Sequence, residues 1–194
     1  MQIIDNRALL LKVRNPDRIT TVIPKSKVLS DDGEVAEVLV NWDLEESIVL
    51  KNLKFKDIPS PINASYNWPG LYKPFAHQKV TSSFLTMHRR SFCFNEQGTG
   101  KTGSVIWASD YLMTKGIIKR VLVICPLSIM DSAWRNDLFK LAMHRKVDVA
   151  YGKPEKRKDI IAGDAEYVII NYDGVEIVAN DILKGGFDLI VIDE

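Results

Sequence analysis

The segment that most constrains the fold of this chain is a glycine-rich loop. The loop contains Glu96, Gln97, Gly98, Thr99, Gly100, Lys101 and Thr102. It follows a short apolar run at residues 92–94 and precedes residues 101–115, whose apolar side chains recur with helical spacing. Glycines let the backbone turn tightly, and the free N–H groups at a helix N-terminus favour negative charge. The sequence therefore predicts a phosphate-binding loop between a buried strand and a helix.

Two side chains of this loop have defined roles in such a site. Lys101 would reach the β- and γ-phosphates of a nucleotide, and the hydroxyl of Thr102 would bind Mg²⁺. The usual pattern starts with a glycine six residues before the lysine, where this chain has Asn95, but the ending that contacts phosphate is intact. We therefore expect ATP and Mg²⁺ as cofactors. The loop residues predicted to bind them are Gln97, Gly98, Thr99, Gly100, Lys101 and Thr102.

An acidic pair follows the last apolar run of the chain. Residues 189–192 are entirely apolar, and Asp193 and Glu194 come directly after them. An aspartate at the carboxyl end of a central parallel strand lies beside the phosphate loop and can hold the Mg²⁺ shell. The next glutamate is placed to polarise an attacking water. We expect Asp193 to bind the metal together with Thr102, and Lys101, Asp193 and Glu194 to take part in catalysis.

Strand and helix patterns alternate after residue 70. Short apolar runs predict strands at residues 92–94, 121–125, 147–150, 167–171 and 189–192. Helical patterns lie between them, at residues 101–115, 130–143, 153–161 and 175–183. Strands joined through helices form right-handed crossovers and a parallel sheet with helices on both faces. The expected fold class is α/β.

The first sixty residues have a different pattern. Apolar or β-branched runs predict strands at residues 8–13, 19–23, 35–40 and 48–50, and the turn-forming pair Asp32-Gly33 lies between the second and the third. Prolines at positions 59, 61 and 69 then interrupt regular structure. We therefore expect a small β-rich accessory module at residues 1–62 and a nucleotide-binding lobe at residues 63–194.

Composition excludes several other classes of protein. Of the 194 residues, 46% are hydrophobic and 26% are charged, which is typical of a globular protein and not of a disordered or fibrous one. No apolar run is long enough to cross a bilayer, and two cysteines provide neither a disulfide framework nor metal-ligand spacing. We expect a soluble intracellular protein of the cytoplasm, nucleoid or nucleus, with no membrane partner. The net charge of +1 creates no long-range attraction to nucleic acid, although one cleft can still concentrate positive charge.

These motifs resemble those of the superfamily II helicases and translocases, most closely the Swi/Snf-like branch. That branch has Asp-Glu-Met-Gly-Leu-Gly-Lys-Thr where this chain has residues 95–102, and it reads adenine through a segment like Leu-Arg-Pro-Tyr-Gln. Residues 72–78 correspond to that segment and include Tyr72, Phe75 and Gln78, with extra residues between the proline and the glutamine. The resemblance implies that Gln78 pairs with the adenine edge and that Phe75 or Tyr72 stacks on the base.

Two further segments resemble motifs that contact nucleic acid in this family. Residues 123–128 end in Pro126, Leu127 and Ser128 and precede Trp134, and residues 169–172 are similar to a Thr-Thr-Tyr segment with Asn171 at the second threonine. The resemblance implies nucleic-acid contacts at Pro126, Ser128 and Asn171. It covers residues 71–194 and does not extend to the first sixty residues.

The resemblance also implies a RecA-like first lobe, incomplete after Glu194, of a DNA-dependent ATPase that couples hydrolysis to movement on nucleic acid. A second RecA-like lobe, in the same or another chain, supplies the arginines that complete the ATP site in this family. Residues 1–194 alone are therefore expected to hydrolyse ATP at close to the background rate. Double-stranded DNA is the first expectation for the partner, and the residues leave single-stranded DNA and RNA open. A P-loop ATPase that does not act on nucleic acid, and a non-catalytic nucleotide- or DNA-binding fragment, are the alternatives.

Limited proteolysis tests the expected boundary between the module and the lobe. Brief digestion should cut first between Lys54 and Lys73, because the prolines there predict an irregular, accessible segment. Mass spectrometry of the early fragments identifies the cut sites. Early cuts confined to residues 101–194 would contradict this boundary.

Overall fold

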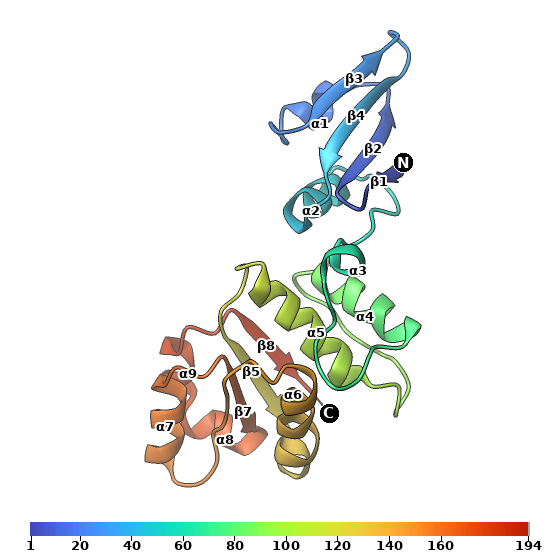
Figure 1. The fold of residues 1–194 in the computed structure, drawn as a ribbon. Coiled ribbons are helices and arrows are strands. Elements are labelled where there is room, and N and C mark those ends of the chain that lie inside the picture. Colours follow the sequence, from blue (N-terminus) through green and yellow to red (C-terminus); the bar gives the residue numbers. More distant parts are fainter. Residues whose placement is uncertain (194) are drawn as a thin grey trace. The chain divides into compact units, whose positions relative to one another are not determined.

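The chain forms two compact units in the computed structural model, which describes residues 1–193 (Figure 1). The first unit comprises Met1–Tyr66 with Ser83–Ser91, and the second comprises Asn67–Ser82 with the rest of the chain. One of the three boundaries between the units, at residues 82 and 83, lies within helix α4 (Ala76–Thr86), and the other two lie outside helices and strands. The proposed division into two domains at residue 62 stays a prediction.

An antiparallel sheet is the centre of the first unit. Its strands are β1 (Gln2–Ile4), β2 (Ala8–Val13), β3 (Lys27–Asp31) and β4 (Ala36–Asn41), in the order β1-β2-β4-β3. Alternate side chains point to the core, so that Leu9, Leu11, Val38 and Val40 are buried while their neighbours along each strand are more exposed. The expected β-rich module is confirmed as a small antiparallel sheet.

A tight turn at the Asp-Gly pair joins β3 to β4. The carboxylate of Asp32 accepts hydrogen bonds from the backbone N–H groups of Val35 at 2.7 Å and Glu34 at 2.9 Å, and these bonds lower the pKa of Asp32. Gly33 has a φ of +87°, which a residue with a side chain rarely adopts. The turn predicted from the sequence is therefore present.

Two of the four strands expected in the first unit are helical instead. Residues 19–23 belong to helix α1 (Asp17–Thr20) and the turn after it, and residues 48–50 lie inside helix α2 (Leu44–Asn52). The buried residues explain the error, because Ile19 and Ile23 are four apart and α2 buries Leu44, Ser47 and Leu50 at helical spacing. A short helix α3 (Ile62–Ser65) follows Pro59 and Pro61.

The second unit is built on a parallel sheet. Its strands are β5 (Val121–Cys125), β6 (Val147–Val149), β7 (Tyr167–Asn171) and β8 (Leu189–Ile192), in the order β6-β7-β5-β8. Every pairing is parallel, and Val121 of the central strand β5 lies opposite both Tyr167 and Leu189. The expected α/β class is confirmed, and the carboxyl ends of β5, β7 and β8 meet at one edge of the sheet.

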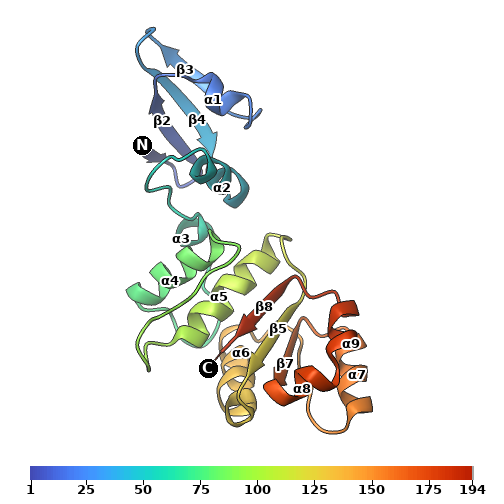
Figure 2. The same cartoon turned by 180° about the vertical axis from the view of Figure 1, so that it is seen from behind.

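Helices cover both faces of this sheet (Figures 1 and 2). One face, which carries Leu122 and Val168, packs against α7 (Pro154–Ala162), α8 (Tyr172–Ile177) and α9 (Ala179–Lys184). The other face lies against α5 (Lys101–Thr114), where the Ser109 and Tyr167 hydroxyls are hydrogen bonded at 2.8 Å. Ile190 and Ile192 of β8 stay exposed. None of the helices in residues 1–193 is both long and apolar enough to cross a bilayer.

One other expectation for the second unit was wrong, and two were correct only in part. Residues 92–94 form no strand within the described chain, and Phe92 and Phe94 are 82% and 90% exposed with their rings stacked on each other. The helix expected at residues 130–143 is composite, with a 3-10 turn η1 (Leu127–Ile129), a π-helix η2 (Met130–Arg135) and α6 (Asn136–Leu141). The helix expected at residues 175–183 breaks at Val178, whose buried side chain lies in the core.

A buried ion-pair network connects helix α5 to the opposite, amino-terminal edge of the sheet. The Asp110 carboxylate on α5 is 1% exposed and accepts hydrogen bonds from Arg145 Nε at 2.6 Å and His144 Nε2 at 2.9 Å. Arg145 also binds Glu166, just before β7, at 2.8 Å. Burial acts to lower the pKa of Arg145, but the hydrogen bonds to Asp110 and Glu166 outweigh it and raise the pKa. The guanidinium therefore remains charged and fixes the far end of α5.

Replacing Asp110 with alanine should destabilise the parallel unit by about 3 kcal/mol, since it breaks a buried pair and leaves Arg145 with one carboxylate. Urea denaturation measures this change in the free energy of unfolding. Asp164→Ala is the matched control, because its pair with Lys146 is exposed on both sides and should change the free energy of unfolding far less. Equal losses of stability in the two variants would contradict the conclusion that the buried Asp110 ion pair stabilises this unit.

Candidate functional site

Two glycines shape the loop before helix α5. Gly98 and Gly100 have φ values of +75° and +74°, in the left-handed region that glycine adopts without strain. A Cβ at Gly100 would also collide with the Gln78 amide, so any other residue there would displace this side chain. Helix α5 starts directly after Gly100 and continues for 14 residues, and its N-terminus therefore directs unpaired N–H groups toward the loop.

The ammonium group of Lys101 is turned back over the loop. Its Nζ donates to the backbone carbonyls of Asn95 at 2.8 Å and Glu96 at 3.2 Å. The Thr99 hydroxyl donates to the same Glu96 carbonyl at 2.8 Å. A positive charge is therefore held beside the loop, where phosphate oxygens can replace the carbonyls as its partners.

Gln78 connects the segment before α4 to this loop. Its side chain is 8% exposed, accepts a hydrogen bond from the Phe75 N–H at 2.9 Å, and donates to the Thr99 carbonyl at 3.3 Å. His77 Nε2 lies 3.0 Å from the same carbonyl, and its ring stacks with the exposed ring of Phe75 at 5.8 Å. The structure thus brings Phe75 and Gln78 to the loop. His77 is not among the residues predicted to bind the nucleotide, and here it supports Phe75 and contacts the loop.

Asp193 is fixed by three elements of the second unit. Its backbone N–H donates to Ile124 of β5 at 2.9 Å, and its carbonyl accepts a hydrogen bond from the Tyr172 hydroxyl at 2.5 Å. Its carboxylate Oδ2 accepts the indole N–H of Trp134 at 2.8 Å. Burial raises the pKa of the neighbouring Cys125 thiol to about 11, and the charge of Asp193 adds to the shift. Glu194 lies outside the described residues.

The three residues expected to contact nucleic acid occupy the same edge of the sheet but differ in accessibility. Pro126 is half-buried at the end of β5, and Ser128 is exposed in η1. Asn171, at the end of β7, is 5% exposed, and its Oδ1 accepts a hydrogen bond from Arg157 at 2.9 Å. The Asn171 side chain is therefore already hydrogen bonded within the protein, while Ser128 is exposed to solvent. All three contacts stay predictions.

The residues of the glycine-rich loop, together with Asp193, fit a nucleotide with Mg²⁺. Left-handed glycines, a long helix N-terminus and the Lys101 ammonium suit the phosphates. Mg²⁺ in such sites takes one or two protein oxygens and completes its shell with phosphate and water. The Thr102 hydroxyl in the first turn of α5 and the Asp193 carboxylate offer that set of oxygens.

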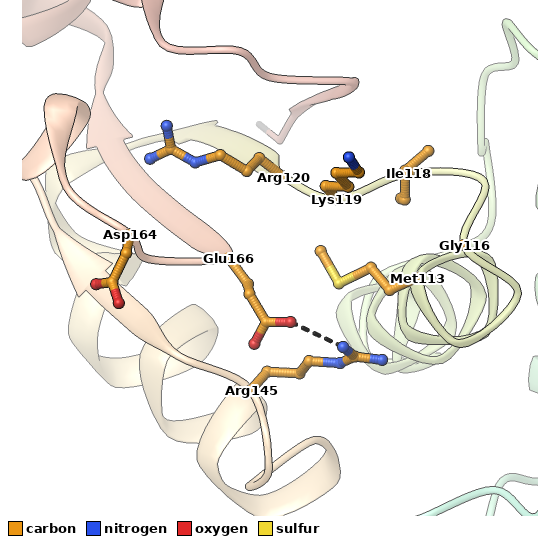
Figure 3. Close-up of a pocket in the computed structure, with 8 residues that line it drawn as sticks. All are labelled: Met113, Gly116, Ile118, Lys119, Arg120, Arg145, Asp164 and Glu166. Atoms are coloured by element: carbon orange, nitrogen blue, oxygen red, sulfur yellow. Dashed lines mark hydrogen bonds and ion pairs between the residues drawn. The ribbon is translucent and has the colours of Figure 1, made fainter.

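A cavity of about 340 Å³ lies elsewhere in the second unit, beside the amino-terminal ends of β5 and β7 (Figure 3). Arg120, Arg145, Asp164 and Glu166 are among its lining residues. Figure 3 shows the ion pair between Arg145 and Glu166, and Asp164 is paired with Lys146. Arg120 instead donates to the backbone carbonyls of Ala165 and Ile161. The cavity contains none of the predicted site residues.

A parallel α/β sheet, a glycine-rich loop at a helix N-terminus and an aspartate after a neighbouring strand together define a P-loop nucleotide-binding lobe. Residues 69–194 match the family described as the res subunit of type III restriction enzymes. This match spans well over half of the chain, so the chain belongs to that family. The family domain is the N-terminal lobe of superfamily II helicases, and the expected membership in that superfamily, with its RecA-like fold, is confirmed.

Among solved structures, the Sulfolobus solfataricus SWI2/SNF2 ATPase core in complex with dsDNA is similar to the chain, with a TM-score of 0.48 and 20% sequence identity. The similarity covers 64% of this chain and 32% of that chain. The present chain therefore spans about a third of the length of that protein. No curated protein is similar enough in sequence to count as a relative.

Replacing Lys101 with alanine should weaken ATP binding about 10- to 100-fold, because it removes a charge-assisted contact to phosphate of about 1.5–3 kcal/mol. Isothermal titration calorimetry with ATP and Mg²⁺ measures the change. Lys158→Ala, an exposed lysine of α7 away from the loop, should leave the affinity as it is in the wild type. An unchanged affinity in the Lys101 variant would exclude this loop as the phosphate site.

Proposed function

We propose that this chain is the ATP-binding lobe of a DNA-dependent ATPase, a helicase or Swi/Snf-like translocase that couples ATP hydrolysis to movement on nucleic acid. The observation that carries the proposal is the phosphate loop at residues 98–102, with Lys101 held beside it, in a chain that also places Asp193 at the end of a parallel strand. Membership in a superfamily II family supports the same conclusion. The proposed partners are double-stranded DNA and a second RecA-like lobe.

The residues of the loop and of the strand end have distinct tasks in this proposal. Lys101 exchanges its two carbonyl partners for phosphate oxygens and stabilises the charge that develops on the transferred group. Thr102 and Asp193 hold Mg²⁺, and Glu194 orients and polarises the attacking water. Bound MgATP supplies the phosphoryl group and a divalent cation that neutralises it.

The segment before α4 binds the base in this proposal. The exposed ring of Phe75, supported by its stack on His77, offers a face for adenine. Gln78 already bonds the carbonyl of Thr99 in the loop, so a base that pairs with Gln78 is connected directly to the phosphate site. In this proposal, the Gln78 amide therefore links recognition of the base to the conformation of the phosphate loop.

Nucleic acid is proposed to bind along the carboxyl edge of the sheet, next to the phosphate site. Ser128 is exposed there, and the η1 turn that carries it follows β5 directly. Hydroxyl and backbone N–H groups at such positions contact phosphate oxygens and position a duplex without reading its sequence. The predicted contacts of Pro126 and Asn171 belong to the same edge.

Steady-state ATPase assays test this function. Together with its second lobe, the protein should hydrolyse ATP, duplex DNA should stimulate the rate, and Glu194→Gln should abolish the stimulated activity. Residues 1–194 alone should hydrolyse ATP near the background rate, because the absence of the second lobe's arginines lowers the rate by a factor of roughly 10³–10⁵. Asp159→Asn, on the exposed side of α7, serves as a control with unchanged activity.

Strong DNA-stimulated turnover by residues 1–194 alone would overturn the two-lobe account. Hydrolysis by the two-lobe protein that no nucleic acid stimulates would instead favour a P-loop ATPase with a different substrate.

A further inference from the structure

Trp134 makes an unusual contact for a core residue. It is among the largest fully buried side chains, at 1% exposure, yet its indole N–H donates to the Asp193 carboxylate at 2.8 Å. Indole has a single donor and no acceptor, so the direction of this hydrogen bond follows from the orientation of the ring. A ring packed in the core cannot reorient without opening a void. The carboxylate therefore has a partner in a fixed position.

The backbone of Asp193 is fixed independently of Trp134. Its N–H is bonded to Ile124 of β5, and its carbonyl is bonded to the Tyr172 hydroxyl at the start of α8. With both backbone groups fixed, rotation of the side chain is the freedom that remains. The Trp134 indole restricts that rotation because it binds Oδ2. Trp134 thus acts on the direction of the carboxylate and not on the position of the strand.

The local backbone around Trp134 is itself exceptional. Trp134 lies in the π-helix η2, between the 3-10 turn η1 and helix α6. π-Helical turns are rare and occur mostly at functional sites, because their wider turn carries a conformational cost. This turn buries both Met130 and Trp134 at 1% exposure. The π-turn is therefore part of the arrangement that brings the indole to Asp193.

We propose that Trp134 is a positioning residue for the Mg²⁺ of the nucleotide site, and that its indole N–H orients the Asp193 carboxylate for the cation. The proposal rests on the proposed function, which makes Asp193 a metal ligand. Hydrogen bonds from outside the ligand shell orient metal-binding carboxylates, and their loss typically weakens metal binding about 10- to 100-fold. The indole leaves the other carboxylate oxygen for the cation or for its bound water.

The first test compares ADP binding with and without Mg²⁺ in the full chain, by isothermal titration calorimetry in MgCl₂ and in EDTA. Trp134→Phe keeps a ring in the core and removes the donor. The increase in ADP affinity that Mg²⁺ produces should be roughly 10-fold smaller in the variant than in the wild type. The ADP affinity measured in EDTA should be the same for both proteins. Trp42→Phe is the matched control, because Trp42 is also buried and donates its N–H to the Pro59 carbonyl at 2.9 Å in the first unit.

The second test uses the wild-type protein and does not depend on how the variant folds. Nuclear magnetic resonance of the four indole N–H groups should show the Trp134 signal shifting when ADP and Mg²⁺ are added together, and far less when ADP is added in EDTA. The Trp42 signal should not move. A Trp134 signal that stays in place while the Mg²⁺ complex binds would overturn the proposal.

The outcomes separate this proposal from the function on which it rests. A wild-type chain that binds no nucleotide overturns both. A wild-type chain that binds ADP more tightly with Mg²⁺, combined with a Trp134→Phe variant of equal Mg²⁺ dependence, overturns the role of Trp134 alone. A fall in affinity that is equal in MgCl₂ and in EDTA also contradicts it, since that is the result of a general packing defect.

Discussion

The candidate site depends on the hydrogen-bond ladders on both sides of β5. This strand pairs in parallel with β7 along one side and with β8 along the other, in a register that aligns Val121 with both Tyr167 and Leu189. Parallel pairing places the ends of all three strands at one edge, where Asn171 ends β7 and where Pro126 and Asp193 directly follow β5 and β8. A shift of either ladder would separate groups that must act on one ligand. The ladders are therefore the physical basis of the site.

The features predicted correctly from the sequence are those that local patterns determine. Apolar runs located β5, β7 and β8, and the loop around Gly98 and Gly100 was recognised from its own residues. The run at residues 92–94 was misread because a strand needs a pairing partner, which the described residues do not provide. The expected strand at residues 48–50 is wrong because a short apolar run is compatible with both a strand and a buried helix segment.

The contacts that complete the candidate site could not be predicted from local patterns. Trp134 and Asp193 are 59 residues apart, and their hydrogen bond depends on a π-turn that has no sequence signature of its own. Gln78 and Thr99 are 21 residues apart, and only the folded chain shows that the amide is bonded to the loop. The sequence alone identifies residue types that suit a nucleotide site. Tertiary structure then determined which of them meet.

The central claim is that a nucleotide with Mg²⁺ binds at the loop before α5, between the Gln78 segment and the end of β8. Hydrogen–deuterium exchange with and without a non-hydrolysable ATP analogue and Mg²⁺ tests this claim most directly, since bound groups slow the exchange of the amides they contact. The account predicts slower exchange at residues 95–104, 75–79 and 189–193, with no change in the antiparallel sheet of the first unit. Protection confined to that sheet, or to the cavity beside Arg120 and Glu166, would contradict it.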